Sequence, residues 1–134
     1  MKSTQIKKIK NAKVVKGKGR GKRIGIATVN FDPKHAKDLE EGVYVCRILS
    51  DNRKFWGVLH FGPRPTFGEK SKSFEVHLLD FDDSSSLIDE ADIEIFDFVR
   101  QVINFESTED MIERIKEDIK IAKEKILSLE GLVR

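Results

Sequence analysis

The chain has one cysteine, one tryptophan, one tyrosine and three prolines among 134 residues, and it has no long apolar run. The single cysteine, Cys46, excludes an internal disulfide and suits a reducing cytoplasm. No apolar stretch approaches the roughly 20 residues that a membrane-spanning helix needs, and the N-terminus lacks the apolar segment of a secretory signal. The sequence therefore predicts a cytoplasmic protein, a single domain over residues 1–134, without a membrane partner and able to exist as a monomer.

Acidic residues are absent from the first 23 positions, which contain ten Lys and Arg residues. The remaining 111 residues contain 15 Lys and Arg and 23 Asp and Glu, so their balance is −8 (15 − 23), although the whole chain has a net charge of +2. A nucleic-acid-binding protein more often spreads basic charge over one face of its fold. The local excess favours a site for a small anion and no nucleic-acid partner.

Within this basic region, residues 14–30 read V-V-K-G-K-G-R-G-K-R-I-G-I-A-T-V-N. Glycines let the backbone turn several N–H groups toward one point, which suits phosphate oxygens, and basic side chains add full positive charge. The residues expected to bind phosphate are Gly17, Gly19, Arg20, Gly21, Lys22 and Thr28.

Thr28 and Asn30 are spaced two apart, so on an extended strand they lie on one face and present hard oxygens suited to Mg²⁺. The segment could therefore hold a metal-bound nucleoside triphosphate. The alternative is a flexible basic arm that binds nucleic acid. The pattern fits neither a P-loop nor a dinucleotide-binding fingerprint, because no apolar helix follows the glycines.

The middle of the chain predicts short strands separated by turns, with many β-branched and aromatic residues. The expected strands are 10–15, 24–31, 42–49, 54–61, 73–81 and 92–99. Helical spacing then appears at Ile112, Ile115, Ile119, Ala122, Ile126 and Leu129. Connections this short exclude parallel crossovers. The pattern indicates an all-β-dominated antiparallel barrel at about 10–105 with one amphipathic helix at about 107–129 packed on it.

Five motifs in order resemble the riboflavin kinase (flavokinase) domain, which occurs alone or as the C-terminal domain of bacterial bifunctional riboflavin kinase/FAD synthetases. The matching stretches are V-K-G-K-G-R-G with I-G-I-A-T-V-N (15–30), G-V-Y (42–44), G-V-L-H-F-G-P-R-P-T-F-G (57–68), E-V-H-L with D-F (75–81), and the partial match R-Q-V-I-N-F (100–105). The family has G-V-A-N-I-G where residues 57–62 read G-V-L-H-F-G.

The resemblance implies a six-stranded antiparallel Greek-key barrel that transfers the γ-phosphoryl group of ATP to the ribityl 5′-hydroxyl of riboflavin, giving FMN. It places the metal ligands for Mg²⁺ on Thr28 and Asn30 and the catalytic carboxylate on Glu75. It places the flavin contacts on Arg100, Asn104 and Phe105.

Glu75 also has a simple structural interpretation, because a Glu on an alternating strand usually faces solvent. Its face, however, also contains Leu79, so that side of the strand is not simply solvent-exposed. A carboxylate held on a rigid strand can take the proton of an attacking alcohol.

The sequence departs from the family at Ala27, Val29, Val102 and the loop 82–91, of which the last two lie toward the flavin. The alternative function is therefore a non-catalytic barrel that binds flavin or nucleotide. Truncation of residues 1–12 should be tolerated by a kinase and should weaken a binder that relies on the arm.

Overall fold

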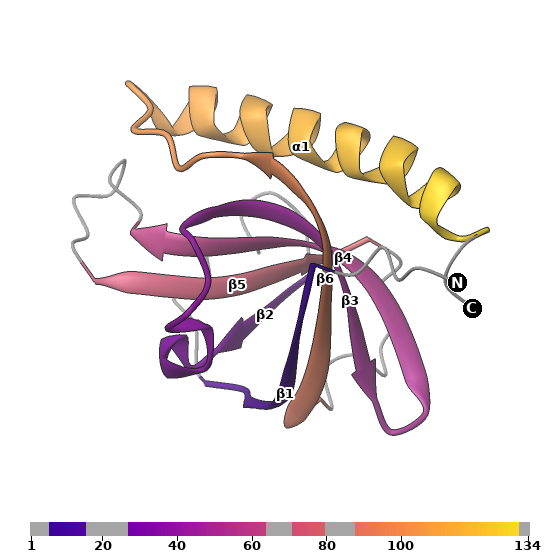
Figure 1. Ribbon diagram of the computed structural model, residues 1–134. Helices are drawn as coiled ribbons and strands as arrows, with labels where there is room; N and C mark the ends of the chain where they lie inside the picture. Colours follow the sequence, from indigo (N-terminus) through magenta and orange to yellow (C-terminus); the bar gives the residue numbers. More distant parts are fainter. Residues whose placement is uncertain (1–5, 16–26, 64–70, 80–87, 132–134) are drawn as a thin grey trace.

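The computed structural model describes residues 6–15, 27–63, 71–79 and 88–131. In these ranges the chain forms six strands and one long helix (Figure 1). The strands are β1 (Lys7–Lys13), β2 (Thr28–Phe31), β3 (Gly42–Ser50), β4 (Arg53–Pro63), β5 (Lys72–Leu78) and β6 (Glu90–Arg100). A short 3-10 helix, η2 (Pro33–Ala36), follows β2, and the helix α1 (Thr108–Leu129) ends the described chain.

All strand pairs are antiparallel, and the order across the sheet is β1-β6-β3-β4-β5-β2. Strands β3, β4 and β5 form a meander, and β6 returns to lie beside β3. This arrangement is a Greek key. The order also places β2, which follows the glycine-rich segment, against β5.

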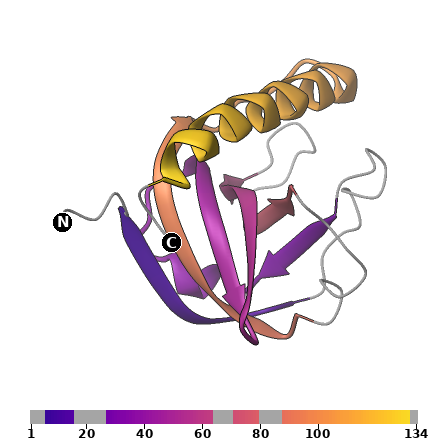
Figure 2. The same cartoon turned by 90° about the vertical axis from the view of Figure 1, so that its right-hand side faces the viewer.

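The sheet curls until its two edge strands meet (Figure 2). Val14 and Phe31 form an isolated bridge, Val15 N–H donates to the Asn30 carbonyl at 2.8 Å, and Asp32 N–H donates to the Lys13 carbonyl at 2.9 Å. These bonds satisfy edge groups that would otherwise invite pairing with another chain. The predicted six-stranded antiparallel barrel with one helix is confirmed.

Alternation along the strands produces two separate cores. The inner face fills the barrel with side chains that include Phe31, Leu59, Phe74, Val76 and Ile93. The outer face of β3, β4 and β6 packs against α1 through Val43, Val45, Val58, Phe96, Ala122, Ile126 and Leu129. Helix α1 therefore covers only part of the outer face, as Figures 1 and 2 show.

Helix α1 has a clear start. Ser107 has an extended backbone, and its hydroxyl accepts a hydrogen bond from Asp110 N–H at 3.1 Å, which satisfies one of the free donors of the first turn. Glu109 and Asp110 in that turn complement the positive end of the helix dipole. The expected helix is confirmed.

Most strands lie where the sequence predicts them, and their ends differ by a few residues. The main difference is β1, which begins at Lys7 and ends at Lys13 instead of spanning 10–15. Within the described ranges, no helix combines the length and apolarity that a membrane span requires.

Candidate functional site

Two rows of side chains cross the outer face of the sheet, because directly paired residues of antiparallel strands point to the same side. In the first row Asn30 of β2 pairs with Glu75 of β5, Glu75 pairs with His60 of β4, His60 pairs with Val43 of β3, and Val43 pairs with Arg100 of β6. Glu75 thus lies between an amide and an imidazole.

The second row lies two residues along each strand. Thr28 pairs with His77, His77 pairs with Val58, Val58 pairs with Val45, and Val45 pairs with Asp97. Together, the two rows make a polar region over β2, β5 and one residue of β4. The apolar part of the rows, over β3 and β4, lies under α1.

The polar region is withdrawn from bulk solvent. Glu75, His60 and His77 have exposed fractions of 7%, 6% and 6%, while Thr28 and Asn30 on the edge strand are partly exposed. A buried carboxylate and two buried imidazoles need compensating partners, which is unusual on a surface that serves only to pack. The expectation that the face of Glu75 is not simply solvent-exposed is confirmed.

The neighbouring residues Phe74 and Val76 explain why Glu75 is held firmly. Both are buried in the barrel core, with exposed fractions of 1% and 0%. Because successive residues of a strand point to opposite faces, burying Phe74 and Val76 fixes Glu75 on the outer face. A shift of one residue in the strand pairing would turn Glu75 into the core and Phe74 and Val76 to the outer face.

The donor set of this region suits a hard cation without forming a complete cage. Thr28 and Asn30 supply two neutral oxygens on one face, next to the carboxylate of Glu75. Mg²⁺ is usually held by one or two protein groups, waters and substrate phosphates. Within the described ranges, no group of three or more His, Cys, Asp or Glu residues could hold a metal by itself.

The sequence-predicted phosphate residues Gly17, Gly19, Arg20, Gly21 and Lys22 lie outside the described residues. Thr28, the sixth, lies on β2 beside His77. The structure therefore brings Thr28 and Asn30 together with Glu75, which lies more than 40 residues later in the sequence.

The predicted flavin residues Arg100, Asn104 and Phe105 lie at the end of β6 and in the connection to α1. The Arg100 guanidinium donates to Asp118 at 2.8 to 3.1 Å and lies 5.6 Å from the centre of the Phe105 ring. Asn104 is exposed. Three strand spacings of about 4.8 Å separate Arg100 from Glu75, or roughly 15 Å. The flavin role of these residues stays a prediction.

Two buried polar residues did not emerge as site residues from the sequence, one on this face of the sheet and one on α1. His60 occupies the Asn position of the family motif, and Asp118 lies within the apolar stripe of the helix, three residues after Ile115 and four before Ala122. A polar residue at an apolar helical position was the available signal for Asp118. Asp118 has an exposed fraction of only 2% and accepts from both Arg100 and Arg114.

The chain is similar in sequence to known proteins. The sequence matches the family Flavokinase, described as riboflavin kinase, over residues 8–126. It is 34% identical over 110 residues to the trifunctional protein RibF/MnmA of Mycoplasmoides gallisepticum, covering 81% of this chain and 17% of that protein. It is 33% identical over 107 residues to the RNA-binding riboflavin kinase RibR of Bacillus subtilis, covering 79% and 46% respectively.

A third relative is the bifunctional riboflavin kinase/FMN adenylyltransferase of Haemophilus influenzae, 31% identical over 113 residues and covering 83% of this chain and 36% of that protein. The chain thus spans less than half the length of each of these relatives. The crystal structure of a macrolide-efflux protein from Streptococcus pneumoniae matches with a TM-score of 0.64 at 25% identity, covering 84% of this chain and 37% of that one. Because the family match extends over most of the chain, and the barrel has the expected strands and helix, the chain belongs to the riboflavin kinase (flavokinase) family.

Proposed function

We propose that the chain is a riboflavin kinase that transfers the γ-phosphoryl group of ATP to the ribityl 5′-hydroxyl of riboflavin. The observation that supports this most directly is the pairing of Asn30 with Glu75 on a buried polar face. The family match and the names of two relatives, both called riboflavin kinases, support the same reaction.

Glu75 is the proposed general base. A primary alcohol is a weak nucleophile until its proton is removed as the new bond forms. The strand β5 holds the carboxylate on one side of the sheet between two other strands, so little orientation is lost when the substrate binds. In this proposal Glu75 takes the proton of the ribityl hydroxyl as the hydroxyl oxygen attacks the γ-phosphorus and ADP leaves.

Thr28 and Asn30 are the proposed ligands of Mg²⁺, and residues 17–22 are the proposed phosphate-binding segment. When bound, the metal neutralises charge on the phosphates of ATP. The proximity of Asn30 to Glu75 would place the phosphate end of ATP next to the base. The flavin contacts from Arg100, Asn104 and Phe105 belong to the same proposal.

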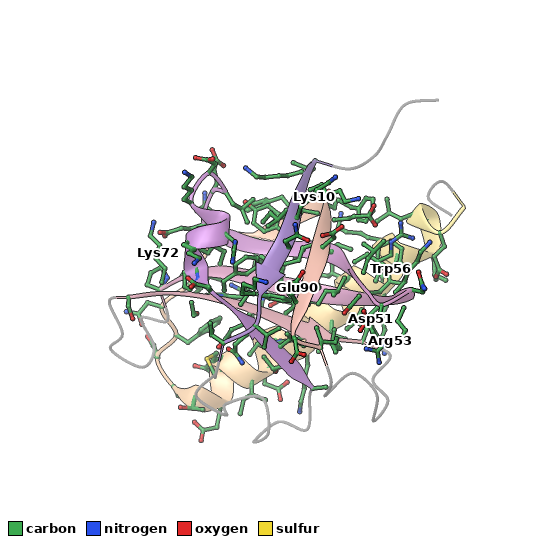
Figure 3. The ribbon with its side chains drawn as sticks, turned by 90° about the horizontal axis from the view of Figure 1, so that it is seen from below. Lys10, Asp51, Arg53, Trp56, Lys72 and Glu90 are labelled. Carbon is green, nitrogen blue, oxygen red and sulfur yellow. The ribbon has the colours of Figure 1, made fainter. Side chains whose placement is uncertain are left out.

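The lysines of β1 support a small-molecule site over a nucleic-acid surface, although one relative is named as RNA-binding. Lys8 pairs across the strands with Glu94, and Lys13 forms an ion pair with Glu90. Figure 3 shows Lys10 and Glu90 on these two neighbouring strands. The ion pair with Glu90 therefore offsets part of the positive charge of β1. We propose riboflavin and ATP as the partners of a cytoplasmic monomer.

The decisive experiment incubates the protein with riboflavin and Mg-ATP and measures FMN and ADP by chromatography. We expect equal amounts of both products, and a loss of turnover of about 10²-fold or more in Glu75→Gln, the range ascribed to a general base. Glu41→Gln is the matched control, because Glu41 is half-exposed and pairs with Lys72 at the far end of β5. Its turnover should equal that of the unaltered protein.

Flavin binding without ADP formation would instead identify a non-catalytic binder. Equal turnover in Glu75→Gln and the unaltered protein would remove Glu75 from the mechanism while leaving the reaction itself intact.

A further inference from the structure

His60 is a buried histidine on the same face as the proposed base. It lies on β4 and is the direct cross-strand partner of Glu75, on the side of Glu75 opposite to Asn30. Its exposed fraction is 6%, close to the 7% of Glu75. Side chains of directly opposed residues have Cβ atoms about 5 Å apart. An imidazole and a carboxylate so placed are within reach of a hydrogen bond.

The residues around His60 indicate which polar group its ring can contact. On its own strand the nearest residues of the same face are Val58 and Gly62, and across the sheet they are Val43 and Glu75. Of these four neighbours only Glu75 has a polar side chain. Placing a polar ring next to two buried valines is unfavourable unless the ring has a polar partner.

We propose that His60 is a positioning residue for Glu75, an inference that rests on the proposed function. An imidazole N–H that holds one carboxylate oxygen restricts the rotation of the carboxylate and leaves its other oxygen directed at the substrate hydroxyl. Asn30 approaches Glu75 from the opposite strand, so the base is bracketed from both sides.

The residue type suits this role. A neutral imidazole donates an N–H without adding a full charge, whereas a lysine at the same place would form an ion pair and weaken the base. The family motif has Asn at this position, and an amide also offers an N–H donor. The two residues should therefore be interchangeable in function, while an apolar residue of similar size should not be.

The test compares three variants in the FMN assay. His60→Leu removes both ring nitrogens and should lower kcat by up to about 10²-fold, the effect of a small misplacement of a catalytic group. KM for Mg-ATP and for riboflavin should change little, since substrate binding is not removed. His60→Asn should recover most of kcat. Val45→Ala is the control for loss of stability alone. It creates a cavity under α1, in the neighbouring row of side chains, and should keep kcat.

Thermal unfolding of each variant, followed by circular dichroism, shows whether it is folded at the assay temperature. If His60→Leu does not fold, the comparison is made with His60→Asn and His60→Ala at a lower temperature. Unchanged kcat in folded His60→Leu or His60→Ala would overturn the positioning role while the kinase reaction stands. Absence of FMN from the unaltered protein would overturn both the reaction and the role, so the two failures are distinguishable.

Discussion

Burial changes the acid–base behaviour of two residues of β3. Cys46 is fully buried, and desolvation raises the pKa of its thiol well above the ordinary value of 9.0. Burial also raises the pKa of Tyr44 above its ordinary value of 10.0, with a smaller contribution from the negative charge of Glu40. The Tyr44 hydroxyl donates to the Glu40 carbonyl at 2.6 Å. Both groups therefore keep their protons in the folded protein at pH values where the unfolded chain loses them.

We expect the free energy of unfolding to fall as the pH rises above about 9. The folded state then binds more protons than the unfolded state, so each group contributes a decrease of up to about 1.4 kcal/mol per pH unit. Below pH 8 these two groups should have no effect. Urea unfolding at pH 7 to 10 measures the slope. Cys46→Ala should be less stable throughout, yet its slope between pH 9 and 10 should be shallower than that of the unaltered protein. An identical slope would show that the thiol does not contribute.

The sequence could identify single residues of the site but not their neighbours. Alternation placed Glu75 on a face separate from Phe74 and Val76, and the spacing of Thr28 and Asn30 placed them together. It could not show that Asn30 opposes Glu75, because that contact depends on the order of strands in the sheet. For the same reason His60 had no visible role until β4 was paired with β5.

At the scale of elements, α1 is attached to the barrel by charge as well as by apolar packing. Arg100 at the end of β6 donates to both oxygens of Asp118, and Arg114 one turn earlier donates to the same carboxylate. The side chains of Arg100 and Asp118 have exposed fractions of 9% and 2%. Lys125 near the other end of the helix pairs with Asp97 of β6 at 3.0 Å.

Asp118→Asn should destabilise the protein by about 3–5 kcal/mol, because removing one partner leaves the buried Arg100 without a compensating charge. Glu113→Gln is the matched control on the same helix. Both side chains of its ion pair with Lys116 are exposed, so we expect the free energy of unfolding to change by less than about 1 kcal/mol. Chemical denaturation of the three proteins measures the difference. Equal stability of Asp118→Asn and Glu113→Gln would show that apolar packing alone holds α1.

The helix was the element that the sequence predicted best, since the period of its apolar residues is a local signal. The turn of the β3–β4 hairpin was harder to predict from the sequence. Its turn residues Asp51 and Asn52 both have positive φ, 48° and 63°, as a two-residue type I′ turn requires. The start of β1 was missed because lysines are poor strand formers. In the structure Lys8, near the start of β1, lies across from Glu94 of β6.

At the scale of the molecule, β1 closes the barrel. It pairs with β6 along its length, and the bonds around Val14 and Phe31 join it to β2. Ile9 and Ala12 of β1 are buried in the barrel core with exposed fractions of 6% and 0%. Strand β2 is only four residues long and would lose these bonds if β1 were absent. The expectation that a kinase tolerates removal of residues 1–12 does not take into account that most of β1, which closes the barrel, lies in these residues.

Deletion of residues 1–12 should therefore unfold the protein or lower its stability by more than the ~2–5 kcal/mol that truncating one buried isoleucine costs. Deletion of residues 2–5 leaves β1 complete and should change the melting temperature little. If activity is lost only because the barrel opens, the longer deletion should lose its cooperative melting transition together with FMN formation. A protein lacking residues 1–12 that melts like the unaltered protein would contradict the closing role of β1. Such a result would mean that the other five strands hold Asn30 against Glu75 without it.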